Sequence, residues 1–107
     1  MRIEIECPAA IRRSEEVRIR AILFNDSYEP VAIMRRAFIG PNVGYPRPEA
    51  VEPGFDTPEN PLILQPFTYY GRERTYDNLP PGKIQVTARF KENNEDLSAT
   101  RILTVSP

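Results

Sequence analysis

The 107-residue sequence contains no histidine, and this absence excludes more chemistry than any other feature of its composition. Catalysis by Ser-His-Asp or Cys-His groups needs an imidazole as general base, and imidazole is also the commonest transition-metal ligand in proteins. Carboxylate chemistry, a Ser–Lys pair or no chemistry remains. We therefore predict that the protein is not an enzyme and has no catalytic residues, no metal site and no cofactor.

Cysteine is nearly absent as well. Cys7 is the only one, so the chain has no internal disulfide, and it continues the alternation of Ile3 and Ile5, which predicts a buried small hydrophobic side chain. A lone cysteine is more typical of a reducing compartment. No apolar run approaches the ~18–20 residues of a membrane span, and Glu4 and Glu6 interrupt the region where a signal peptide is apolar. We predict no membrane insertion. The chain is either cytoplasmic or a domain excised from a larger protein, and the sequence leaves its compartment open.

A surplus of positive charge is also missing. The formal net charge is −1, whereas a protein that follows nucleic-acid phosphates needs many more cationic than anionic side chains. We predict no nucleic-acid partner. The length of 107 residues is that of a single domain, so residues 1–107 are predicted to share one core.

Apolar and polar residues alternate along several short segments, which is the pattern of half-buried β-strands. Strands are predicted over residues 2–7, 15–24, 31–39, 72–79, 84–90 and 97–105, with a hairpin loop over 91–96. Turn residues separate these segments, as in Pro80-Pro81-Gly82, and no segment has a helical period. Short strands at this spacing are typical of an all-β sandwich or barrel.

Two adjacent arginines stand inside the predicted third strand. Arg35 and Arg36 would point to opposite faces of a regular strand, which would direct one of them toward the core. Either a β-bulge lets both reach solvent, or one arginine is held at a sheet face for a carboxylate partner.

The segment from Pro41 to Pro66 has a different composition. It contains seven of the twelve prolines, and residues 48–66 carry four carboxylates and no basic residue. Proline density lowers the entropic cost of closing a long loop, so an ordered, extended excursion is predicted. Its acids and aromatics are predicted to bind a protein partner, or its acids fold onto the basic sheet surface of the same chain, and the two readings are not exclusive. An acid–base pair or a calcium site are further readings of the acids. The loop residues assigned to partner binding are Tyr45, Glu49, Glu52, Phe55, Asp56 and Glu59.

Tyrosines supply a second candidate surface. Tyr45, Tyr69, Tyr70 and Tyr76 offer rings that stack on sugars, although adjacent Tyr69 and Tyr70 cannot share a strand face, so one of them is expected in the core. Carbohydrate is therefore an alternative partner. Arg35, Arg36, Tyr69 and Tyr70 are the sheet residues assigned to partner binding.

Several short motifs resemble one protein family. The corner Leu79-Pro80-Pro81-Gly82 precedes the alternating Ile84, Val86, Ala88 and Phe90, and Leu103-x-Val105 ends the chain. Asn25-x-Ser27-x-x-Pro30-Val31 forms an earlier turn. These motifs resemble bacterial immunoglobulin-like modules, including adhesion-type domains and intracellular proteinase inhibitors of the BsuPI type.

The resemblance implies an immunoglobulin-like antiparallel β-sandwich of about seven strands, with the long proline-rich excursion between the third and later strands. It also implies a non-catalytic structural or recognition module that binds a protein partner. The alternatives are a proteinase inhibitor or regulator acting through residues 41–66, and a carbohydrate-binding module. An exposed edge strand would also allow two copies to pair as a dimer.

Overall fold

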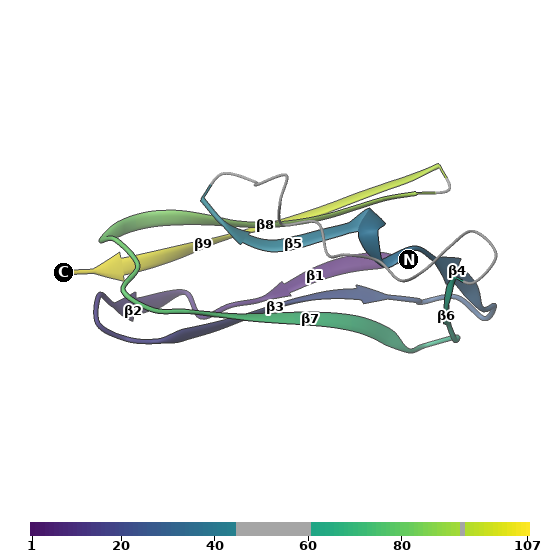
Figure 1. Ribbon diagram of the computed structural model, residues 1–107, viewed down its shortest axis with the longest axis horizontal. Helices are drawn as coiled ribbons and strands as arrows, with labels where there is room; N and C mark the ends of the chain where they lie inside the picture. Colours follow the sequence, from purple (N-terminus) through teal and green to yellow (C-terminus); the bar gives the residue numbers. More distant parts are fainter. Residues whose placement is uncertain (45–60, 93) are drawn as a thin grey trace.

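A computed structural model of the chain describes residues 1–44, 61–92 and 94–107. These residues form β-strands, one short 3₁₀ turn and no α-helix, which confirms the all-β prediction (Figure 1). The elements are β1 (Arg2–Glu6), β2 (Ala10–Arg12), β3 (Val17–Phe24), β4 (Val31–Ile33), η1 (Arg35–Ala37), β5 (Phe38–Val43), β6 (Leu62–Leu64), β7 (Tyr69–Tyr76), β8 (Gly82–Glu92) and β9 (Glu95–Ser106).

The strands form three sheets. One sheet has the order β1-β3-β7, a second has the order β2-β9-β8-β5, and β4 pairs with β6 in a small third sheet. In Figure 1 the two larger sheets form layers, with β5, β8 and β9 above and β3 and β7 below. All pairings are antiparallel except one, because β2 runs parallel to β9. The predicted purely antiparallel arrangement is wrong for that pair.

Pro8 marks the point where the N-terminal segment leaves the first sheet. A proline has no backbone N–H, so β1 ends before it and the chain leaves the three-stranded sheet. The chain then joins the edge of the other sheet, where Thr104 N donates to Ala9 O at 2.9 Å and Arg13 N donates to Ser106 O at 2.8 Å. The N-terminal segment therefore contributes one strand to each larger sheet.

One hydrophobic core lies between the two larger sheets. The inward faces that the alternation predicted for residues 15–24, 84–90 and 97–105 are largely confirmed, and Ile84 is half-buried at the end of its row. The fully buried side chains at the centre come from both sheets and include Ile19, Leu23, Phe38, Val86, Phe90 and Leu103. Both sheets thus depend on the same buried surface for stability.

The predicted third strand over residues 31–39 is wrong. The structure divides it into β4, the 3₁₀ turn η1 and β5, and the two strands belong to different sheets. The turn is closed by a hydrogen bond from Ala37 N to Met34 O at 3.0 Å. A chain that passes from one sheet to another must bend. The bend lies at Arg35 and Arg36, and it is a 3₁₀ turn and not the predicted β-bulge.

Other predicted boundaries also shift. The excursion over 41–66 is too long, because β5 continues through Pro41 to Val43 and residues 62–64 form β6. The polar strand predicted over 72–79 begins earlier, at Tyr69, and ends at Tyr76. The hairpin loop predicted over 91–96 is shorter, because β8 continues to Glu92 and β9 begins at Glu95.

Proline fits in β5 because this strand is an edge. Pro41 follows a cis peptide bond after Gly40, and the pairing of β5 with β8 shifts in register between Ile39 and Asn42. Gly40 has φ +115, and a Cβ there would lie 2.8 Å from the backbone oxygen of Thr87. Only glycine fits a position where the chain approaches β8 so closely.

Candidate recognition surface

The structure describes four of the ten residues assigned to partner binding. Arg35, Arg36, Tyr69 and Tyr70 lie within the described ranges. The six loop residues, Tyr45, Glu49, Glu52, Phe55, Asp56 and Glu59, lie outside the described residues.

Tyr69 and Tyr70 point to opposite faces of β7, as predicted. The half-buried Tyr70 packs its ring edge-on against Phe38, with the centroids 5.9 Å apart. The guanidinium carbon of Arg35 lies 5.8 Å from the Tyr70 ring centroid, whereas Arg36 is exposed. The structure therefore brings Arg35 and Tyr70 together on the inner side of β7, with Tyr69 on the outer side.

Arg72 is a buried arginine that the sequence reasoning missed. It is 8 % exposed, and its Nη1 donates hydrogen bonds to Phe38 O at 2.6 Å and Gly40 O at 3.1 Å. Its Nη2 donates to Arg35 O at 3.3 Å. The guanidinium carbon lies 4.9 Å from the ring centroid of Phe38. Arg72 thus binds the backbone of η1 and β5 from the facing sheet.

The rest of the inner face of β7 continues this polar contact with β5. Arg74 Nη1 donates to Asn42 Oδ1 at 3.3 Å, and the Tyr76 hydroxyl donates to Pro41 O at 3.1 Å. Long polar side chains therefore close the sandwich along this side. In the sequence these residues occupy the same alternate positions as Tyr70, which indicates that they share its face of the strand. A polar side chain on a strand normally indicates solvent exposure, so the pattern did not predict their contact with β5.

Asn25 is the second residue whose role the sequence did not reveal. It is 0 % exposed, and its Nδ2 donates to Glu29 O at 2.8 Å and to Leu64 O at 3.0 Å. Its Oδ1 accepts hydrogen bonds from the backbone and the hydroxyl of Ser27. Asn25 also exchanges backbone bonds with the turn before β7, from Asn25 N to Thr68 O and from Phe67 N to Asn25 O. One buried residue therefore joins the turn after β3 to β6 through its side chain and to the turn before β7 through its backbone.

These joined turns carry an exposed aromatic pair, Tyr28 and Phe67, which we call the aromatic end. Tyr28 is 87 % exposed and Phe67 is 51 % exposed. Their rings meet edge-on, with centroids 5.0 Å apart. Phe67 has φ 56, a left-handed conformation that is strained for a bulky side chain. The Asn25 network holds the backbone in this strained state and leaves both rings in solvent.

A shallow hollow lies on the outer face of the three-stranded sheet. Tyr69, Gly71, Arg20 and Glu73 line a volume of about 330 Å³. A Cβ at position 71 would lie 3.3 Å from Tyr69 Cε2 and 3.6 Å from Arg20 Cδ, so the ring and the arginine stem flank the glycine. Arg20 Nε lies 3.3 Å from Glu6 Oε2. We call this the Gly71 hollow.

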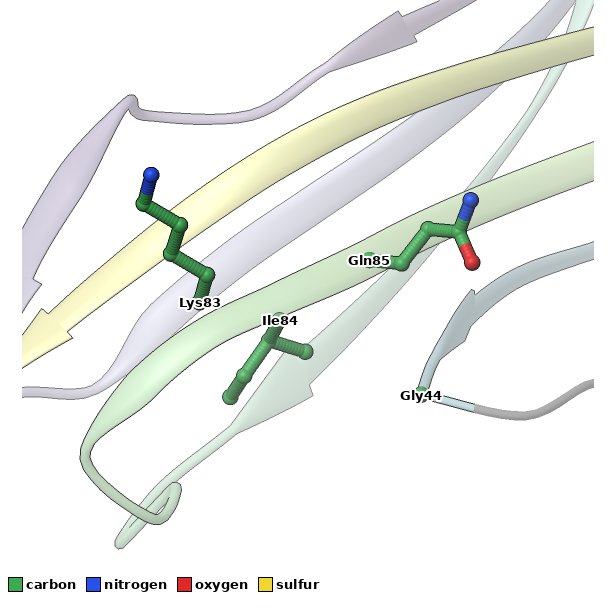
Figure 2. A pocket seen from close by; sticks show the side chains of 4 residues that line it. All are labelled: Gly44, Lys83, Ile84 and Gln85. Atoms are coloured by element: carbon green, nitrogen blue, oxygen red, sulfur yellow. The ribbon is translucent and has the colours of Figure 1, made fainter.

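A second hollow of about 280 Å³ lies where β5 ends, between Gly44 and the start of β8 (Figure 2). Gly44 N donates to Gln85 O at 2.8 Å. Lys83 and Ile84 extend to opposite sides of β8. The hollow offers one ammonium, one amide and one aliphatic group, which do not form an acid–base pair.

Two pKa shifts bear on the chemistry that the described residues offer. Burial raises the pKa of the Cys7 thiol, and Sγ donates to Pro8 O at 3.2 Å, so this thiol is protonated and poorly nucleophilic at neutral pH. The hydrogen bond from Arg89 lowers the pKa of Asp96 on the β8–β9 hairpin. No group of three metal-ligating side chains occurs among residues 1–44, 61–92 and 94–107. No helix in the same ranges has the length and hydropathy to cross a bilayer.

Comparisons with protein-family models, with curated proteins and with solved structures found no match.

Proposed function

We propose that this chain is an immunoglobulin-like module that recognises a protein partner without catalysing a reaction. The strand order supports the fold. In immunoglobulin domains the first two strands and the fifth share one sheet, and the third, sixth and seventh share the other. If β1 and β2 are two halves of one divided first strand, β1-β3-β7 and β5-β8-β9 follow that order.

The aromatic end carries the functional part of the proposal. Burying an aromatic ring stabilises the folded state by kilocalories per mole. Tyr28 and Phe67 nevertheless keep most of their side-chain surface in solvent. Phe67 additionally occupies a left-handed backbone conformation that costs about 1–2 kcal/mol. A strained, exposed aromatic residue held in place by a buried amide lowers the stability of the fold, whereas its exposed ring is available to bind a partner.

A protein partner fits these features better than a small ligand. Rigid aromatic side chains within a polar surround are the residues that dominate protein–protein binding free energy. Because the Asn25 hydrogen bonds fix the backbone at both turns, binding requires little further ordering of the backbone there. The two rings therefore act as preorganised anchors for a hydrophobic pocket on the partner.

The experiment compares three tagged forms of the full chain as baits in extracts of the cells that make it. These are the wild type, the double variant Tyr28→Ala/Phe67→Gly, and the control Ile102→Ala, which removes a side chain that is 51 % exposed on β9. Glycine at position 67 keeps the left-handed backbone conformation accessible, so we expect the double variant to fold. We expect a protein that the wild type and the control retain and the double variant loses.

The purified partner then gives the affinity. We expect the double variant to bind at least about thirtyfold more weakly, because losing an aromatic hot spot costs about 2 kcal/mol or more. Equal binding by all three forms, or the absence of any protein whose retention depends on the two rings, contradicts the proposal.

The two alternative functions rest on other residues. An inhibitory loop within 41–66 depends mainly on residues 45–60, which lie outside the described part of the chain. A carbohydrate platform needs several outward rings. Of Tyr69, Tyr70 and Tyr76, only Tyr69 is on the outer face of β7, where it flanks the Gly71 hollow.

A further inference from the structure

Asn25 also begins the only N-x-S/T sequence of the chain. Residues 25–27 read Asn-Asp-Ser, and none of the other asparagines has serine or threonine two positions later. A sequence of this kind, with any residue except proline in the middle, is an acceptor of N-linked glycans and normally lies in an exposed surface loop. Here the acceptor residue is 0 % exposed. The acceptor sequence and the burial of its asparagine are therefore in conflict.

The conflict concerns the Nδ2 atom of Asn25. N-glycosylation forms a bond from this nitrogen to the anomeric carbon of a sugar, breaks the bond from that carbon to a lipid-linked pyrophosphate, and releases one proton from the nitrogen. The side-chain amide then has one N–H in place of two. In the fold both are used, because Nδ2 donates to Glu29 O at 2.8 Å and to Leu64 O at 3.0 Å. A glycan therefore deprives at least one of these carbonyls of its donor.

The surroundings of Asn25 also enclose its side chain. Its backbone is hydrogen-bonded to Thr68 and Phe67, and its Oδ1 accepts from the backbone and the hydroxyl of Ser27. Leu64, whose carbonyl accepts one of the Nδ2 bonds, is itself only 4 % exposed. A sugar attached to Nδ2 has to reach solvent, which requires the turn after β3 to separate from β6. The glycan thus breaks the contact that joins these segments.

We propose that the native fold of this chain and a glycan on Asn25 exclude each other. The folded chain does not expose Nδ2, so only an incompletely folded chain accepts the sugar, and a chain that has accepted it does not form the Asn25 network. The native protein is therefore made where asparagine is not glycosylated, or from chains that escaped the reaction. This property limits the compartment in which the chain folds, and it does not depend on the partner of the aromatic end.

The test directs the full chain into the endoplasmic reticulum of cultured cells with an added signal peptide. Ser27→Ala removes the acceptor sequence and keeps the bonds from Asn25 to Glu29 and Leu64. A mobility shift that peptide-N-glycosidase reverses reports the glycan, and secretion and protease resistance report folding. We expect the glycosylated wild type to be retained in the cells and rapidly degraded by added protease. Ser27→Ala should be unmodified, secreted and protease-resistant.

A relocated acceptor separates the position of the glycan from its presence. In the Ser27→Ala background, Asp96→Asn gives residues 96–98 the acceptor sequence, because Leu97 and Ser98 follow. The side chain of Asp96 is 52 % exposed on β9, so a glycan there projects into solvent. We expect this double variant to be glycosylated and yet secreted and protease-resistant like Ser27→Ala.

Three results overturn the proposal. The first is a glycosylated wild type that is secreted and resists protease as well as Ser27→Ala does. The second is a wild type that acquires no glycan in cells that modify the relocated acceptor, because residues 25–27 are then not an acceptor. The third is a relocated glycan that also abolishes folding, because the burial of Asn25 is then not the cause.

Discussion

At the scale of single residues, Asn25 forms hydrogen bonds that a turn usually divides among several polar groups. Its amide donates to two backbone carbonyls, one four residues away and one 39 residues away, and its carbonyl orders Ser27. Backbone polar groups in a buried position need such partners, because leaving one unsatisfied costs about 1–3 kcal/mol. The exposed rings of the aromatic end therefore depend on a residue that no partner would touch.

Replacing Asn25 with alanine tests this dependence. The variant leaves the Glu29 and Leu64 carbonyls without their amide donor, so we expect the free energy of unfolding in urea to fall by about 2–4 kcal/mol. Ser27→Ala is the control, and it should cost about 1 kcal/mol because water replaces a partly exposed hydroxyl. Equal losses for the two variants would show that Asn25 is only a turn residue.

The sequence predicted the turn at Asn25 but not the burial of its side chain. Asparagine followed by Asp26 and Ser27 is typical of a solvated turn, because each can bond its own backbone. The partner that buries Asn25 is the carbonyl of Leu64, which is 39 residues away. Local sequence patterns contain no information about a contact at that separation. The exposure of Phe67 could not be predicted from the sequence for the same reason.

At the scale of elements, β7 departs most from the binary pattern of a sandwich strand. An inner face of Tyr70, Arg72, Arg74 and Tyr76 would normally indicate a strand exposed on both sides. Here the long side chains reach the backbone of β5, whose irregular pairing leaves carbonyl groups available. A cation beside several carbonyl oxygens satisfies them without another strand.

Arg72→Leu tests whether this contact fixes β5. Leucine keeps an apolar stem but cannot donate to the carbonyls of Arg35, Phe38 and Gly40, so we expect a loss of roughly 2–4 kcal/mol in unfolding free energy. Amide hydrogens of β5 should exchange faster with solvent in the variant. Arg18→Leu, on the exposed outer face, should change stability by about 0.5 kcal/mol or less. Unchanged exchange in β5 would contradict the assignment.

The division of residues 31–39 into β4, η1 and β5 shows a limit of strand prediction. No glycine or proline marks the bend, and both halves contain residues that favour strands. The bend is imposed by the two sheets that β4 and β5 join, which is a tertiary cause. In contrast, β3, β8 and β9 were predicted well because each buries one face along its length.

At the scale of the whole molecule, the all-β class followed from the sequence because period-2 alternation and turn residues agreed along most of the chain. The exchange of the N-terminal segment between sheets was not predictable, since Pro8 marks where β1 ends but not where the chain goes next. Both larger sheets share one core, so neither can separate without exposing the other. Unfolding should therefore be a single cooperative transition.

One core variant in each sheet tests this expectation. Leu23 on β3 and Leu103 on β9 are both fully buried, and each replacement by alanine should cost about 2–5 kcal/mol because it removes apolar contacts and leaves a cavity. Far-UV circular dichroism and tyrosine fluorescence should report the same midpoint in urea for each variant. Ile102→Ala, next to Leu103 but on the exposed face, should move that midpoint little. If Leu23→Ala lowered the midpoint of only one probe, the two sheets would be unfolding separately, and the shared core would not be the source of their stability.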